Sequence, residues 1–213
     1  MQKTIVLLAN SIKLGGRCIA GVEVQRQDGP SEWTVVKETA SRPKWIRPVS
    51  NVDDGEVPLE MAVRFSNLDI VKLTKATRSP SGYQSENYLF GDIEKIDALP
   101  STARNLSSIV QDPGDQLFGN RGKAVPDEKI HLIDHSLIFV KPEQFSSYST
   151  RSSSGSAQKR GIFTLNEVEY DLPITDPGFV LGSEKEKKTF LTLSLGVLHN
   201  GWHSKLIAGV FCV

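Results

Sequence analysis

The sequence predicts a mainly β protein, with two tandem five-stranded barrels joined by a connector of short helix and loop. Three observations lead to this fold class. Most apolar segments alternate with a period of two, which is typical of strands. The two halves show the same order of elements, with three strands, a short helix and two more strands. Finally, 213 residues divide naturally into two domains of about a hundred residues each.

The first barrel is expected over residues 1–98. A short helix is predicted within Val57–Phe65, where Pro58 suits a first helical position. One further helical turn is predicted over Ile93–Ala98. The expected strands and shorter extended pieces are Thr4–Asn10, Arg17–Gln25, Trp33–Lys37, Trp45–Val49, Leu68–Thr77 and Tyr88–Phe90.

The connector is expected over residues 99–128. Ser101–Gln111 begins with capping-type residues and carries Ala103, Leu106 and Ile109 at helical spacing, so it predicts a helix. Residues 112–128 are rich in Gly, Asp and Pro, which favours a loop.

The second barrel is expected over residues 129–213. Thr175-Asp176-Pro177 is a helix-entry signal, and Ser146–Ser156 has the composition of a flexible loop. Asn200-Gly201 is a hairpin-turn dipeptide. The expected strands are Ile130–Val140, Arg160–Leu165, Val168–Leu172, Thr189–Leu198 and Lys205–Val213. A small Greek-key barrel with its helix between the third and fourth strands is the OB-fold.

Composition limits the possible functions. The 25 basic and 25 acidic residues cancel, which argues against a protein that coats nucleic acid by bulk attraction alone. The distribution is uneven, because residues 1–50 hold eight basic and four acidic residues, whereas residues 51–100 hold five and nine. The first quarter of the chain therefore carries a surplus of positive charge.

The same survey indicates the compartment. Cys18 and Cys212 are too few for a disulfide scaffold or a zinc site built from cysteines. The longest apolar runs are too short to span a membrane, and the apolar run before Asn10 is too short for a signal-peptide core. The cytoplasm is the expected location, with no membrane partner.

A family resemblance extends over most of the chain. The stretches that carry it are Leu8-Ala9-Asn10-Ser11-Ile12-Lys13, Gly16-Arg17-Cys18-Ile19-Ala20-Gly21, Trp45-Ile46-Arg47-Pro48-Val49-Ser50, Leu68-Asp69-Ile70-Val71, Gln84-Ser85-Glu86-Asn87, Tyr170-Asp171-Leu172-Pro173-Ile174-Thr175-Asp176-Pro177 and Lys205-Leu206-Ile207-Ala208-Gly209. Together they resemble the prokaryotic dual OB-containing domain family. The resemblance implies two OB-folds and a role in nucleic-acid binding or processing, with prokaryotic conflict systems as the expected setting. It supplies no catalytic residues.

The first candidate binding group combines cations with one aromatic residue. OB-folds bind single strands through a basic groove and aromatic platforms. In the alternative interpretation, Trp45 and Ile46 belong to the core and the cations lie at strand edges. Arg17 is expected to face solvent or a carboxylate such as Asp69 or Glu86. The members of the group are Arg17, Arg42, Lys44, Trp45 and Arg47.

Two further groups are candidates for nucleic-acid contacts. Tyr83 and Asn87 are the first and last residues of a polar stretch. In one interpretation this stretch reads base edges, and in the favoured alternative it caps a loop. Trp202, His203 and Lys205 follow the Asn200-Gly201 turn, a usual place for binding groups. The expected partner is nucleic acid, preferably single-stranded, with a protein partner in a processing complex as a further possibility.

No cofactor or metal is expected, because the histidines, His131, His135, His199 and His203, lack a spacing that imposes a metal site. Two alternative functions stay open. The first is an enzyme acting on nucleic acid or a nucleotide, which requires at least three of six polar residues around one pocket. These six are Arg17, Arg47, Asp69, Glu86, Asn87 and His203. The second is a protein-interaction adaptor, which requires docking surfaces only.

Overall fold

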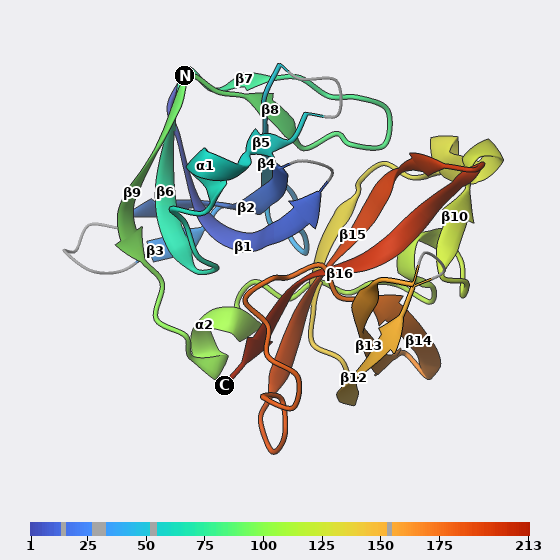
Figure 1. Cartoon of the computed structure of the whole chain (residues 1–213). Coiled ribbons are helices and arrows are strands. Elements are labelled where there is room, and N and C mark those ends of the chain that lie inside the picture. Colours follow the sequence, from blue (N-terminus) through green and yellow to red (C-terminus); the bar gives the residue numbers. More distant parts are fainter. Residues whose placement is uncertain (14–15, 27–32, 52–54, 153–154) are drawn as a thin grey trace.

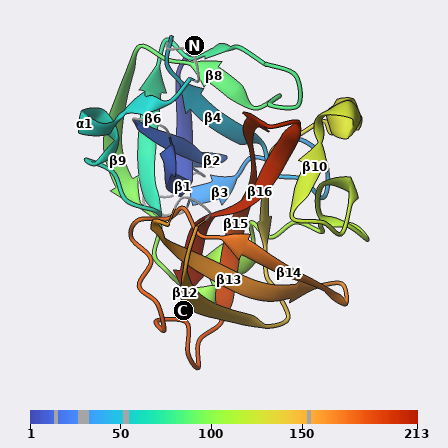
Figure 2. The ribbon, with the colours of Figure 1, turned by 45° about the vertical axis from the view of Figure 1, so that its right-hand side comes forward.

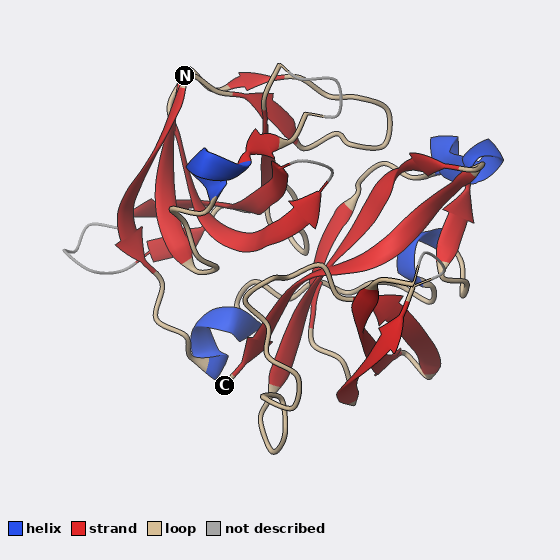
Figure 3. Cartoon of the chain, viewed as in Figure 1, coloured by secondary structure: helices blue, strands red, loops and turns tan. Residues whose placement is uncertain are grey.

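A computed structural model describes residues 1–13, 16–26, 33–51, 55–152 and 155–213. The chain is mainly β, with a few short helices between the strands (Figures 1 and 3). Two groups of curled sheets, one from each half of the sequence, lie against each other. None of the helices in these residue ranges is long and apolar enough to cross a membrane.

The first half forms one sheet with the strand order β7-β8-β4-β2-β1-β6-β9, and β3 and β5 pair with β2. Only Phe90-Gly91 separates β8, which pairs in parallel with β4, from β9, which pairs with β6. The sheet therefore curls back on itself, as the predicted barrel requires. The strands are β1 (Lys3–Lys13), β2 (Gly16–Arg26), β3 (Trp33–Val35), β4 (Trp45–Val49), β5 (Val57–Pro58), β6 (Asp69–Thr74), β7 (Thr77–Arg78), β8 (Asn87–Leu89) and β9 (Asp92–Ala98).

The second half forms two curled sheets, with the strand orders β10-β16-β15-β11 and β12-β13-β14. The chain passes from one sheet to the other between β11 and β12, and a parallel bridge between Ile174 and Ile207 joins them. The sheets resemble half-barrels, as expected for an OB-fold-like domain, and they hold seven strands in the described residues rather than the predicted five. The strands are β10 (Ala124–Pro126), β11 (Leu137–Val140), β12 (Phe145–Arg151), β13 (Ala157–Leu165), β14 (Val168–Pro173), β15 (Thr189–His199) and β16 (Trp202–Cys212).

The helices are short. In the first barrel α1 (Leu59–Ala62) lies between β5 and β6, within the predicted segment Val57–Phe65. The segment between the barrels contains α2 (Ala103–Ser107), which Thr102 caps by accepting from the Asn105 amide. Two 3-10 turns follow, η1 (Leu117–Gly119) and η2 (Asp127–Leu132). Within the predicted connector, β10 already pairs with β16 of the second barrel.

Several local predictions were wrong because tertiary pairing outweighs local pattern. Residues 93–98 belong to strand β9 rather than a helical turn, since their backbone pairs with β6. The serine-rich segment begins as strand β12, paired residue by residue with β13. Ile130–Val140 divides into η2 and β11, and residues 175–188, all described, contain turns rather than a helix.

The two barrels share part of their hydrophobic core. One cluster joins Val6 and Leu8 of β1 to Phe139 of β11 and to Phe190 and Phe211 of the last two strands. A side-chain hydrogen bond adds to this contact, since Thr192 Oγ1 donates to the Leu8 carbonyl oxygen at 2.5 Å. Figures 1 and 2 show β1 close to β16 from two directions. The barrels therefore dock through packed side chains and not through a linker alone.

Candidate functional site

A cleft of about 420 Å³ lies between the barrels, where the end of the β1–β2 hairpin faces β15 and β16. Both barrels contribute side chains to its walls, so the site exists only when the barrels are docked. It is lined by Ser11, Ile12, Lys13, Cys18, Arg47, Gln84, Ser194, Leu195, Gly196, Val197, His199, Ser204 and Leu206.

The second-barrel wall follows from strand alternation along β16. Side chains at a period of two point to the same face of a sheet. His203, Lys205 and Ile207 are buried on one face, which leaves Ser204 and Leu206 for the cleft. Trp202 shares the face of Ser204 and stands at the outer end of the strand, where it is 52% exposed. Trp202 therefore lies on the same strand face as the two lining residues Ser204 and Leu206, without lining the cleft itself.

The turn before Trp202 fixes this placement. Asn200 and Gly201 both have positive φ angles, 49° and 81°, as expected for a two-residue hairpin turn. His199 and Trp202 face each other across the turn, which confirms the predicted hairpin. Asn200 Nδ2 lies 3.2 Å from His199 Nε2.

The first-barrel wall is formed by the end of the β1–β2 ladder. Ile12 pairs with Arg17, and Ser11 pairs with Cys18. Paired residues lie on the same side of a ladder, so Arg17 shares the side of Ile12, which is 60% exposed. Ile12 lines the cleft, and Arg17 is its partner in the ladder without belonging to the lining residues.

The charged residues that line the cleft in the described part of the chain are Lys13 and Arg47, and none of its described lining residues is acidic. His199 adds an imidazole, and Arg47 is paired with Glu86, which lies outside the lining. Gln84, Ser194 and Ser204 add neutral hydrogen-bonding groups, and Ile12 and Leu206 add apolar surface. This combination suits an anionic ligand that also has apolar faces.

A buried hydrogen-bond network fixes the position of the Arg47 side chain. It is 4% exposed, and its Nη2 donates to Ser136 Oγ at 2.7 Å and lies 3.3 Å from Glu86 Oε1. The Ser136 hydroxyl in turn donates to Glu86. Since Ser136 immediately precedes β11, the network connects the two barrels, so Arg47 has a structural role beside its place at the cleft.

Trp45 is part of the core, as in the alternative interpretation. It is 4% exposed, and its Nε1 donates to Gln111 Oε1 at 2.8 Å. Ile46 is also fully buried. The Trp45 ring is therefore not presented for base stacking in this structure.

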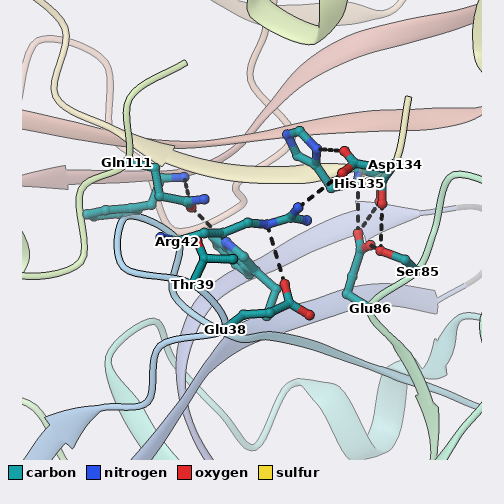
Figure 4. A network of polar contacts seen from close by, with 11 residues as sticks. Glu38, Thr39, Arg42, Ser85, Glu86, Gln111, Asp134 and His135 are labelled. Atoms are coloured by element: carbon teal, nitrogen blue, oxygen red, sulfur yellow. Dashed lines mark hydrogen bonds and ion pairs between the residues drawn. The ribbon is translucent and has the colours of Figure 1, made fainter. Parts of the chain in front are cut away.

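The neighbouring cations make ion pairs. Lys44 Nζ lies 2.9 Å from Glu23 Oε2, and this hydrogen bond raises the pKa of Lys44. Arg42 lies between Glu38 and Asp134 (Figure 4). Both cations line a second, smaller pocket next to the cleft.

Tyr83 and His203 connect the barrels on the other side of the cleft wall. The Tyr83 hydroxyl donates to the Gly196 carbonyl oxygen at 2.8 Å and lies 3.1 Å from His203 Nδ1. The ring of His203 is 3% exposed, and its Nε2 lies 3.0 Å from Asp127 Oδ1. Burial raises the pKa of Tyr83. These two predicted site residues hold Gly196, which lines the cleft.

Asn87 and Lys205 are structural in this conformation. Asn87 is buried, and its Nδ2 donates to Gln84 Oε1 at 3.2 Å. Lys205 is fully buried, and its Nζ donates to the carbonyl oxygens of Leu117 and Asn120 at 2.6 and 2.7 Å. Burial lowers the pKa of Lys205 to about 7.

The set required for an enzyme does not converge on either cavity. Arg47 lines the cleft and Glu86 the smaller pocket, whereas Asp69 forms an ion pair with Lys95 at 2.5 Å. Across the described residues, no three His, Cys, Asp or Glu side chains are grouped as metal ligands.

The family model for the dual OB-containing domain matches residues 3–210. The chain belongs to this family. No curated protein is similar enough to count as a relative.

Similar solved structures include the Ifi202 HINa domain in complex with a 20 bp double-stranded DNA (13% identity, TM-score 0.34, covering 100% of this chain and 95% of that chain). A murine DNA-binding protein bound to double-stranded DNA has 6% identity and a TM-score of 0.36, with coverage of 99% and 93%. The tetrameric p202 HIN2 domain has 10% identity and a TM-score of 0.30, with coverage of 100% and 92%.

Several cleft residues were missed by sequence reasoning. Ile12, Ser194 and Leu206 line the cleft without belonging to any charged or aromatic motif. One sequence feature could have indicated that Ile12 is a site residue. It is an apolar residue three positions before Gly15, close to the end of a predicted strand. Ser194 and Leu206 acquire their place only through the docking of the second barrel.

Proposed function

We propose that this protein binds nucleic acid, preferably a single strand, in the cleft between its two barrels. The observation that carries the proposal is the composition of the cleft, whose described lining residues include Lys13 and His199 beside the buried Arg47 and no carboxylate. Phosphate groups require cations, and the faces of unpaired bases require apolar or aromatic surface.

Trp202 is the proposed stacking platform. Its ring is half exposed and lies on the same strand face as Ser204 and Leu206. Base–aromatic stacking tolerates any sequence, because every base has a π-face. A base stacked on Trp202 would direct the strand along the cleft toward Ile12.

The polar groups have distinct proposed roles. Lys13, His199 and the neighbouring Arg17 would contact the phosphate backbone, which gives affinity without sequence preference. Gln84, Ser194 and Ser204 line the cleft with amide and hydroxyl groups, which can hydrogen-bond with base edges. A single strand is favoured because its unpaired bases can reach both kinds of surface.

The test is a titration of labelled single- and double-stranded oligonucleotides at low salt, followed by fluorescence anisotropy. Trp202→Ala should weaken single-strand binding about tenfold, because one stacked base contributes roughly 1–3 kcal/mol. Tyr148→Ala is the matched control, since Tyr148 is an exposed aromatic residue on β12. No binding at tens of micromolar, or equal affinities of both variants and the native chain, would contradict the proposal.

The same preparation tests the adaptor hypothesis. An adaptor would co-purify with a protein partner from a prokaryotic nucleic-acid processing or defence system and would show no oligonucleotide affinity. The proposal requires oligonucleotide affinity in the purified chain alone, so the two functions give opposite results.

A further inference from the structure

A second cavity, of about 180 Å³, lies beside the barrel–barrel contact. Arg47 lines the cleft and its partner Glu86 lines this second cavity, so the buried pair stands between the two. We call this cavity the polar pocket. It is lined by Glu38, Arg42, Lys44, Trp45, Arg78, Ser85, Glu86 and Tyr88.

The polar pocket has hydrogen-bond donors to spare. Arg42 Nε lies 3.6 Å from Glu38 and Arg42 Nη1 lies 3.5 Å from Asp134, both longer than a well-formed hydrogen bond. The Nε atom of Arg42 is buried and makes no hydrogen bond. An arginine side chain has five N–H donors in a planar fork, and this one uses few of them (Figure 4).

Two further cations face the same pocket. Arg78 of β7 is exposed, and its side chain makes no hydrogen bond or ion pair with the described residues, although its backbone belongs to the ladder with β8. Lys44 contacts Glu23 at 2.9 Å, which leaves further N–H donors of its ammonium group available. Three cations therefore converge on one small volume.

The acceptors of the polar pocket are already occupied or lie at its edge. Glu86 is buried, and it accepts from the Ser136 amide and hydroxyl and pairs with Arg47. Glu38 has a side chain that is 48% exposed, so solvent screens its charge. Ser85 uses its hydroxyl to donate to the Asp134 carbonyl oxygen at 2.7 Å. The pocket is thus rich in donors and poor in free acceptors.

We infer that the polar pocket binds a phosphate group through Arg42, Lys44 and Arg78. Arginine forks match phosphate oxygens in a bidentate geometry, and lysine adds a point charge. Trp45 and Tyr88, both largely buried, form walls that limit access of water to the bound group. A phosphate carries up to two negative charges, which suits three cations better than a single carboxylate would.

The phosphate has two possible sources with the same chemistry. It belongs either to the backbone of a bound nucleic acid, in which case the inference rests on the proposed function, or to a free nucleotide or inorganic phosphate. The variant Arg78→Ala distinguishes them, because Arg78 is exposed and its loss leaves the buried network intact. Arg64→Ala is the control, since Arg64 is exposed and lines a different hollow beside β9.

Isothermal titration calorimetry at low ionic strength measures inorganic phosphate and adenosine monophosphate against the native chain and both variants. If the source is free, Arg78→Ala weakens phosphate binding about tenfold or more, as expected for a charge-assisted contact, and Arg64→Ala does not. If the source is the backbone, inorganic phosphate does not bind, whereas Arg78→Ala weakens oligonucleotide binding and lowers the slope of its salt dependence by about one.

The inference is overturned if neither phosphate nor oligonucleotide binding distinguishes Arg78→Ala from Arg64→Ala. Trp202→Ala separates this result from a failure of the cleft, because it should weaken oligonucleotide binding and leave inorganic phosphate binding unchanged.

Discussion

Gly209 of the last strand lies directly against the carbonyl oxygen of Leu8 in the first long strand, so close that a Cβ atom on Gly209 would overlap it. Thr192 donates a hydrogen bond to that same oxygen. The barrels therefore touch through backbone, and not only through adaptable side chains. Because interiors pack densely and transmit strain, this contact fixes the distance between the two walls of the cleft.

The first prediction concerns this contact. Gly209→Ala should lower the free energy of unfolding by about 1–3 kcal/mol, the usual cost of inserting an atom into a packed interior. Urea unfolding measures it. Gly178→Ala is the control, since its Cβ would stand 3.4 Å from its nearest neighbour. Equal free energies of unfolding for the two variants would contradict the prediction, because they would show that the contact between Gly209 and Leu8 can open without loss of stability.

The second prediction concerns the Arg47–Glu86 pair. Glu86→Gln removes the negative charge that faces buried Arg47, and the uncompensated charge should cost about 3–5 kcal/mol of stability. Adding Arg47→Met should recover part of this loss, because an apolar pair is often as stable as a buried ion pair. The measurement is a double-mutant cycle by denaturant unfolding.

Glu38→Gln provides the comparison for that cycle. Glu38 lies 3.6 Å from Arg42 and is about half exposed, so its loss should cost less than about 1 kcal/mol. If Glu86→Gln were as mild as Glu38→Gln, the pair could not be holding the barrels together.

The barrels were predictable because strand alternation is local information. β15 and β16 read as strands from their period of two, and Asn200-Gly201 gave their turn directly. β12 was not predicted as a strand, because its serines have no strand pattern of their own. It forms only when β13 supplies the partner backbone, and Glu184 accepts a hydrogen bond from the Ser147 hydroxyl at 2.6 Å.

The candidate site was harder to predict, since the type of a residue does not reveal whether another part of the chain covers its side chain in the fold. Trp45 and Lys205 have the chemistry of nucleic-acid contacts, yet Gln111 and Leu117, each far away in sequence, bind their polar atoms in the interior. Trp202 and Arg17 lie at a hairpin end and a ladder edge, and each pairs with a residue that lines the cleft, His199 and Ile12. Only the docking of the two barrels distinguishes these cases.

The third prediction is a pH dependence at Lys205. Burial lowers its pKa in the folded chain to about 7 from an ordinary value of 10.5. Between these values the unfolded chain holds a proton that the folded chain has released, so the contribution of Lys205 to stability should rise as the pH rises. The limit is about 1.4 kcal/mol for each pH unit.

Lys205→Met isolates this effect, because the difference in unfolding free energy between it and the native chain cancels the other titrating groups. That difference should move in favour of the native chain from pH 7 to pH 10.5 and stay flat below pH 7. A constant difference over the whole range would mean that Lys205 keeps its proton, held by the carbonyl oxygens of Leu117 and Asn120.

The fourth prediction uses Cys18 as a reporter of the cleft. Cys18 lines the cleft, so a bound oligonucleotide should slow its modification by a maleimide several-fold in a Cys212→Ser variant. The converse variant, Cys18→Ser, reports Cys212, whose raised pKa, caused by burial, should make it react slowly and independently of oligonucleotide. If saturating oligonucleotide left the Cys18 rate unchanged, nucleic acid would have to bind on another face, because a strand in the cleft cannot avoid the thiol on its wall.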